Sequence, residues 1–428
     1  MWKKREYALA LCVGTWLLAN SAFAEESLSL GEATRKTLVN HAALQVFSYR
    51  EEALMGRRQT SELRPGFELS TELENFAGTG TTSGIDEVEL TVSLSSIIEL
   101  GSKRQARLAS IDARAGLLEM ERQVQALDIL GAMTTQFIAV MALQERLILA
   151  KESEALAKET TATVKSRVDA GAAPDAELLR ARAIGSQARL TVSQIERELE
   201  VAKVALASFW GERRANTSAA EGNLFNFGTS IEFETLYQRS VDSPGIQIYA
   251  SQERLQDSAV KLAKSQSKSD LRWSFGVRRL EGPSDTALVA FVEMPLFSGR
   301  RNRGDVAAAM AEQNEVPIRR EQALNELYAR LFDGYRTRAQ SIEASRTLQD
   351  ETIPALEQAL STTRRAYESG RYGYLDLIAA QQALVDAKAS LIDTASAALQ
   401  AGVIIEQLTG LSLANSDPAQ QLRKEHAR

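Results

Sequence analysis

The chain has 428 residues, of which 44% are hydrophobic and 25% are charged, so its composition is that of a protein that buries a core, not of a disordered one. Its formal net charge is −6 and its pI is about 5.4, which gives no reason to expect nucleic acid as a partner. The single cysteine, Cys12, lies in a leader segment, so disulfides and cysteine metal ligands are excluded from the mature chain.

The amino terminus has the organisation of a secretory signal. Positions 3–5 are basic, an apolar run too short to span a bilayer follows at 7–19, and residues 22–24 give a small-x-small cleavage pattern. We therefore predict that residues 1–24 are a signal peptide, that Cys12 is not lipidated and that the protein is exported.

A helical segment over 25–64 precedes two stretches in which apolar and polar residues alternate. The alternation runs through 67–74 and 87–94, and a turn-rich loop, 76–86, separates the two stretches. Each stretch extends to the roughly ten residues that a tilted transmembrane strand needs. Residues 65–98 are therefore predicted to form a transmembrane β-hairpin.

A long helical hairpin is predicted over 99–211. The sequence of 102–170 is almost free of helix breakers, and a helix of that length, at 1.5 Å per residue, approaches about 100 Å. The stretch VDAGAAPD at 168–175 forms the predicted turn, and a heptad of mostly apolar residues follows over 178–206. Such a rod is too long for a compact domain, so an extended coiled coil is expected.

The chain then repeats the same order of elements. Gly370 follows Gly171 by 199 residues, and the sequences around the two glycines align without a gap, which indicates an internal duplication. Two prolines, Pro317 and Pro354, are expected to kink or break the second long helix. The predicted segments of the second copy and the tail are a helical segment over 212–270, a transmembrane β-hairpin over 271–298, a long helical hairpin over 299–410 and a C-terminal tail over 411–428.

Four strands cannot close a barrel on their own. In lipid, each backbone group left unpaired at an open edge costs several kcal/mol. Two interpretations of the hairpins therefore remain: a soluble sheet, or strands that several chains contribute to one barrel. The signal peptide, the long helices and the duplication favour the shared barrel.

The second turn resembles that of TolC-type outer-membrane efflux proteins in Tyr367, Gly370, Arg371, Leu375 and Asp376. The similarity extends over essentially the whole mature chain. The stretch ELGSKR at 99–104 resembles the sequence that follows the first hairpin in the CzcC-like heavy-metal branch, and 296–304 resembles the sequence after the second hairpin. The chain departs from the family pattern at Asn40-His41, at Ile97-Ile98 and at Ala379, where members often have Asn-Pro, a preceding proline and an aspartate, respectively.

The resemblance implies a mainly α fold with a small β part, in which three chains form a homotrimer. Each chain would give four strands to a twelve-stranded β-barrel, and the helices would form a long periplasmic tube. The protein would lie in the outer membrane of a Gram-negative bacterium, in contact with its lipid and with a large periplasmic portion. Its partners would be a periplasmic adaptor protein and an inner-membrane pump of the resistance-nodulation-division type.

Two sets of candidate site residues follow. The resemblance places the two turns at the periplasmic entrance, where they would gate the tube and contact the adaptor: Gly171, Glu177, Gly370, Arg371, Tyr372, Tyr374 and Asp376. If the apolar strand residues face lipid, the charged ones face the lumen: Glu68, Glu72, Glu74, Glu87, Glu89, Arg272, Arg278 and Glu293. Both sets also have a purely structural explanation, since glycines end helices, acidic residues stabilise helix starts and barrel lumens are polar.

Catalytic chemistry finds no support, because the mature chain has only His41 and His426, no thiol and no cluster of metal ligands. We predict a non-enzymatic efflux duct without a cofactor, and the resemblance implies divalent heavy-metal cations as its cargo. The same duct for drugs or for type I protein secretion is an alternative. A soluble periplasmic coiled-coil adaptor or scaffold is an alternative of a different class, and an exported enzyme is a third.

Overall fold

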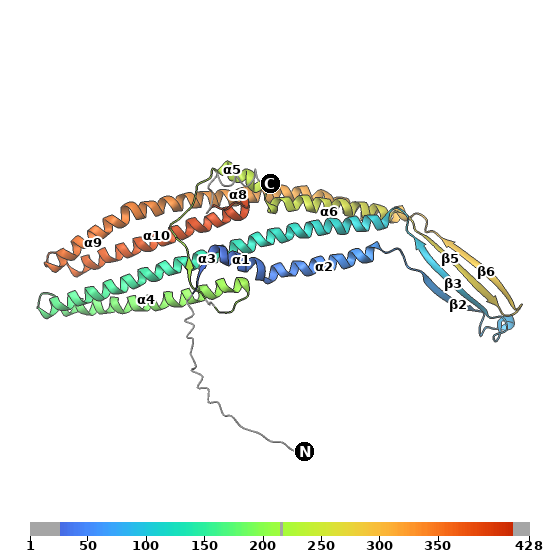
Figure 1. The fold of residues 1–428 in the computed structure, drawn as a ribbon, viewed down its shortest axis with the longest axis horizontal. Helices are drawn as coiled ribbons and strands as arrows, with labels where there is room; N and C mark the ends of the chain where they lie inside the picture. Colours follow the sequence, from blue (N-terminus) through green and yellow to red (C-terminus); the bar gives the residue numbers. More distant parts are fainter. Residues whose placement is uncertain (1–25, 215–216, 414–428) are drawn as a thin grey trace, which may run out of the picture.

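The computed structural model describes residues 26–214 and 217–413, so the predicted signal peptide and the tail beyond 413 lie outside the described residues. Figure 1 shows a long molecule with a small β-sheet at one end and the turns of two helical hairpins at the other. We call these the sheet end and the turn end. Helices run lengthwise between them.

Each half of the chain supplies helices, a β-hairpin, a long helix, a turn and a return helix. The first half consists of β1 (Glu26–Ser29), α1 (Leu30–Asn40), α2 (Ala42–Glu62), β2 (Glu68–Glu74), β3 (Glu89–Ile98), α3 (Lys103–Asp169) and α4 (Asp175–Ala207). The second half consists of β4 (Thr217–Glu221), α5 (Phe233–Val241), α6 (Pro244–Gln266), β5 (Leu271–Leu280), β6 (Asp285–Glu293), α7 (Ser298–Arg301), α8 (Arg303–Thr347), α9 (Ile353–Glu368) and α10 (Tyr374–Thr409). The predicted fold class, mainly helical with two β-hairpins and an internal duplication, is confirmed.

The sheet end is a four-stranded antiparallel sheet in the order β2-β3-β5-β6. Residues paired across strands share a face, and the register pairs Val92 with Val277 and Leu94 with Phe275. One face is therefore apolar, and we call it the apolar face. It includes Leu69, Leu73, Leu90, Val92, Leu94, Trp273, Phe275, Val277, Leu288 and Val292. Among the described strands, β2 and β6 each keep one edge unpaired.

Four buried clusters hold the described helices together. The smallest joins Phe47 and Leu54 of α2 to Leu118 of α3. The largest lies around the middle of α3, where Met133 and Phe137 pack with residues of α4, β4 and α10 such as Leu206 and Ala395. A second cluster lies toward the turn end and includes Leu377, and Leu178 of the predicted heptad packs against it. The third joins α5, α8 and α10. By length and composition, α3 is the one helix of the described residues that is apolar enough to cross a membrane.

The two prolines of the second long helix behave differently. α8 continues through Pro317, so the predicted break does not occur there. Pro317 is exposed, and the carbonyl group that loses its N–H partner can face water. Ahead of Pro354 the helix widens into a π-helical stretch, Leu348–Thr352, before α9 begins. In contrast, α3 runs for 67 residues without interruption.

Candidate functional site at the two ends of the molecule

The charged strand residues gather on the face of the sheet opposite the apolar one, which we call the polar face. The register pairs Glu72 with Thr91, Thr91 with Arg278, and Arg272 with Glu293, so these side chains share one face. The polar face carries these predicted lumen residues: Glu68, Glu72, Glu74, Glu89, Arg272, Arg278 and Glu293.

The two arginines of the polar face neutralise part of its negative charge. The guanidinium group of Arg272 lies 3.1 Å from the carboxylate of Glu68. That of Arg278 lies 3.2 Å from Glu74 and 2.9 Å from Glu89. All these groups are partly exposed, so each pair stabilises the sheet by about 1 kcal/mol or less.

The polar face also carries carboxylates unpaired within the described chain and one exposed aromatic ring. Glu72 and Glu293 have no ion-pair partner among the described residues, so their carboxylates are open to ions in solution. Glu87 precedes β3, and its carboxylate covers Gly282, where an added Cβ would lie 2.5 Å from it. Phe291 is 56% exposed on the polar face. Sequence reasoning missed Phe291 because residues 288–292 are apolar throughout and show no alternation.

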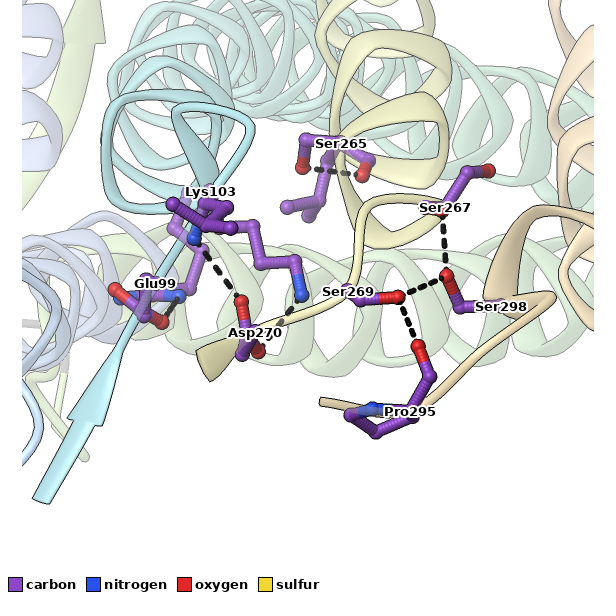
Figure 2. A network of polar contacts seen from close by, with 11 residues as sticks. Glu99, Lys103, Ser265, Ser267, Ser269, Asp270, Pro295 and Ser298 are labelled. Carbon is purple, nitrogen blue, oxygen red and sulfur yellow. Dashed lines mark hydrogen bonds and ion pairs between the residues drawn. The ribbon is translucent and has the colours of Figure 1, made fainter. Parts of the chain in front are cut away.

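Polar contacts fix the sheet onto the helices (Figure 2). Asp270, just ahead of β5, accepts a hydrogen bond from Lys103 Nζ at 2.8 Å and another from the Leu100 backbone N–H at 3.1 Å. Lys103 is 6% exposed, whereas the carboxylate side of this ion pair, Asp270, is partly exposed. Ser298, which follows β6, donates to the carbonyl oxygen of Ser267 at 2.9 Å. The two segments that leave the sheet, one after β3 and one after β6, are thus both anchored to the connection between α6 and β5. We call them the exit from β3 and the exit from β6.

At the turn end, each outgoing helix finishes at a glycine with a left-handed backbone. The φ angle is 67° at Gly171 and 72° at Gly370, a region that side chains other than glycine disfavour. In both turns the N–H of the following residue donates to the carbonyl five residues before it at 2.8 Å, which is a Schellman cap. The two turns therefore reverse the chain in the same way.

The acidic residues that follow the two glycines make different contacts. Asp376 Oδ2 accepts the backbone N–H three residues before it at 2.9 Å and so caps α10. Glu177, its counterpart 199 residues earlier, accepts a hydrogen bond from the Tyr367 hydroxyl at 3.0 Å. Because Glu177 belongs to α4 and Tyr367 to α9, this bond joins the two helical hairpins. Arg371 and Tyr372 lie exposed on the second turn.

Four side chains form what we call the turn-end cluster: Arg167, Glu177, Tyr367 and Tyr374. Tyr367 is 1% exposed, and the guanidinium group of Arg167 lies 4.4 Å from its ring centroid and also donates to its carbonyl oxygen. Burial and the hydrogen bond to Glu177 raise the pKa of Tyr367 to about 12, so its hydroxyl stays protonated and donates.

Tyr374 completes the turn-end cluster. Its ring lies 6.4 Å from that of Tyr367, burial raises its pKa, and its hydroxyl has no hydrogen-bond partner in the described part of the chain. Sequence reasoning missed Arg167, because the contact that defines its role joins residues 200 positions apart. The one available signal was its position four residues before Gly171, the start of the predicted turn.

A family profile described as outer membrane efflux protein matches the chain twice, over residues 38–212 and 237–411. The chain belongs to this family. The two matches begin at positions that differ by the same 199 residues as the two turn glycines, as the predicted duplication requires.

Relatives of this efflux protein include the cobalt-zinc-cadmium resistance protein CzcC of Cupriavidus metallidurans, which is 25% identical over 346 residues that cover 81% of each chain. The pyoverdine export outer membrane protein OpmQ of Pseudomonas putida is 22% identical over 325 residues, 73% of this chain and 67% of that one. A crystal structure of CusC has a TM-score of 0.76 at 15% identity, over 89% of this chain and 91% of that one, and so shows the same fold.

Family membership assigns the location of the efflux protein. It is an outer-membrane channel with a periplasmic helical portion, so the predicted localisation is confirmed. The family is non-enzymatic, as predicted, and its channels form trimers in tripartite efflux systems. Within residues 26–214 and 217–413, no group of three or more potential metal ligands lies together.

Proposed function

We propose that this efflux protein passes divalent heavy-metal cations from the periplasm to the exterior. The likeness to CzcC, which spans four-fifths of both chains, carries the proposal. The duct itself is passive, and an inner-membrane pump of the resistance-nodulation-division type supplies the energy through a periplasmic adaptor. Tight ligation in the duct would stop the flow, so cargo selection belongs to the pump and the duct needs only a favourable field.

The polar face supports this cargo by its charge. Carboxylates outnumber the two arginines there, and Glu72 and Glu293 remain unpaired within the described chain. Repeated around a barrel, these groups make bands of negative charge that concentrate cations and repel anions.

Three chains close the barrel in this proposal. The free edge of β6 pairs with the free edge of β2 in a neighbouring chain, so that three four-stranded sheets give twelve strands without an open edge. The apolar face then meets lipid, and the polar face lines the lumen.

The turn end is the periplasmic entrance in this proposal. The turn-end cluster ties the second helical hairpin to the first, and a bond between rigid helices at the end of the tube holds the entrance in one state. The exposed groups of the second turn, Arg371 and Tyr372 beside the cap formed by Asp376, offer charge and an aromatic surface to the adaptor.

A second cargo is favoured by separate observations. OpmQ exports pyoverdine, an organic molecule, and in this chain Phe291 places an apolar ring on the polar face. An organic cargo would contact such a ring, whereas a hydrated cation gains little from it.

Deletion of the gene in its host distinguishes the cargoes. Growth would be measured across zinc, cadmium, cobalt, nickel, copper and silver, with a panel of drugs alongside and the wild-type gene restored as the control. Sensitivity to one or a few of the metals, reversed by the wild-type gene, is the expected result. Drug sensitivity with unchanged metal tolerance would refute the metal cargo and leave the duct in place.

The effect of the charged residues of the polar face on ion selectivity can be measured in planar bilayers. Under a salt gradient, the double variant Glu72→Gln with Glu293→Gln is expected to lower the preference for cations, measured as the reversal potential. Arg272→Gln should change the reversal potential in the opposite direction. Equal reversal potentials for all three proteins would show that the polar face does not select ions.

A further inference from the structure

The two exits from the sheet differ in how their basic residues are used. At the exit from β3, Lys103 pairs with Asp270 at 2.8 Å, and Arg107 pairs with Glu99 at 2.6 Å. Arg104 donates to a backbone carbonyl at 3.3 Å. Every basic side chain at this exit therefore has a partner within the chain.

At the exit from β6 three arginines are unpaired. Arg300, Arg301 and Arg303 are exposed, and within residues 26–214 and 217–413 their guanidinium groups make no hydrogen bond or ion pair. Three unpartnered guanidinium groups within four positions repel one another, so the site favours an anion. The two exits can be compared because they are equivalent segments of the duplication. At the exit from β3 the basic residues have partners within the described chain, whereas at the exit from β6 these three arginines do not.

The anchoring of this exit directs Arg300 outward. Ser298 donates to the Ser267 carbonyl oxygen, as Figure 2 shows, and Asn302 donates to the Ala263 carbonyl oxygen at 2.6 Å. Residues four apart share one side of a helical turn, so Ser298 and Asn302 define the inner side. Arg300, midway between them in sequence, lies on the opposite side.

An exposed apolar stretch leads directly to these arginines. Val292 belongs to the apolar face and is 64% exposed. Met294, Leu296 and Phe297 follow it, and Phe297 is 80% exposed with a left-handed backbone, φ 62°. A bulky residue rarely adopts that conformation, and here the aromatic ring is exposed instead of packed in the core. The lipid-facing surface thus continues past the end of β6 up to the arginines.

We propose that this stretch and the three arginines bind an anionic phospholipid of the periplasmic leaflet. The arginines hold the headgroup phosphate, which guanidinium groups match in charge and geometry. Val292, Met294 and Phe297 contact the acyl chains. The three arginines lie at the level of the inner leaflet of the outer membrane, because the helices that begin here are periplasmic. The site is independent of the cargo and would anchor the channel at a fixed depth.

The test compares two charge-matched triple variants of the full-length channel. The first is Arg300→Gln, Arg301→Gln and Arg303→Gln. The control is Arg320→Gln, Arg336→Gln and Arg346→Gln, which removes three exposed arginines from α8, farther along the chain from the membrane exit. Phosphatidylglycerol and phosphatidylcholine would be titrated onto detergent-solubilised protein, and bound lipid would be counted by native mass spectrometry.

The wild type and the control variant are expected to prefer phosphatidylglycerol. Each arginine near a lipid surface changes affinity by about fivefold, so the first triple variant should bind phosphatidylglycerol about a hundredfold more weakly. Phe297→Ser should weaken both lipids by about tenfold, because it removes an aromatic contact with the acyl chains.

Three results would overturn the proposal. Equal phosphatidylglycerol binding by the first triple variant and the wild type would show that the arginines play no part. Complete displacement of the lipid by inorganic phosphate would make the site one for free phosphate. Dissociation of the trimers of the first triple variant in lipid-free detergent, while those of the control persist, would mean that the arginines contact a neighbouring chain.

Discussion

Replacing Tyr367 with phenylalanine removes one hydroxyl from the turn-end cluster and little else. The ring keeps its place under the guanidinium group of Arg167, so packing and the cation–π contact are retained. What is lost is the hydrogen bond of 3.0 Å to Glu177, which joins α9 to α4. A hydrogen bond to a charged group contributes about 1.5 kcal/mol or more, so the variant should shift the entrance equilibrium by about tenfold in each chain.

The assay is single-channel recording in planar bilayers. On the proposal that the Tyr367–Glu177 bond holds the entrance shut, the fraction of time that the channel spends in a conducting state should rise in the Tyr367→Phe variant, because that bond is lost. Tyr372→Phe is the matched control, since Tyr372 is 51% exposed in the same turn and its hydroxyl makes no hydrogen bond within the described residues. It should behave like the wild type.

Correctly assembled Tyr367→Phe channels that open no more often than the wild type would refute a role of this hydrogen bond at the entrance. Equal opening of the two variants would also refute it, because the effect would then come from the loss of any tyrosine hydroxyl near the entrance. Thermal melting of both variants would verify that the trimers remain intact during the recordings.

Three further predictions concern stability. Gly370→Ala should lower the melting temperature by the equivalent of about 1 kcal/mol, because φ there is 72°, whereas Gly373→Ala should be nearly neutral, because φ there is −82°. Asp270→Asn leaves a buried lysine without its carboxylate and should destabilise the chain by about 3 kcal/mol in denaturant titrations, whereas Asp393→Asn breaks an exposed pair and should cost under about 1 kcal/mol. The pKa of Tyr367 in the folded chain, about 12, lies above its ordinary value of 10. The stability that the protonated hydroxyl contributes is therefore fully present below pH 10 and is lost as the pH rises through 12. The melting temperatures of the wild type and Tyr367→Phe should therefore converge over that range, and a constant difference would contradict the assignment.

Local patterns in the sequence were enough to predict the order of elements. Alternation marked the strands that carry Glu72 and Arg278, and glycine marked the turns, because each signal depends on residues close together in the chain. The same logic failed at Pro317, where an exposed position lets a helix continue through a residue that usually ends it. The sequence pattern also did not place Phe291 on the polar face, because a strand that is apolar on both faces shows no alternation.

The candidate sites depended on contacts that no local pattern contains. Glu177 and Asp376 occupy equivalent positions of the duplication, yet one bridges two hairpins and the other caps its own helix. The two residues differ because their neighbours in space differ. Tyr367 contacts Glu177, and no described residue of the first turn makes the equivalent contact with Asp376. Similarly, only the fold shows that Asp270 receives Lys103 from the other half of the chain.

The free edges of β2 and β6 have a genetic consequence. A barrel that three chains close has three junctions at which β6 of one chain pairs with β2 of the next. One chain with a defective edge strand therefore prevents the other two from closing the barrel. A cell that makes normal and edge-defective chains in equal amounts would then assemble only about one barrel in eight entirely from normal chains. Mutations at these edges should therefore be dominant, whereas mutations that unfold the chain before assembly should be recessive.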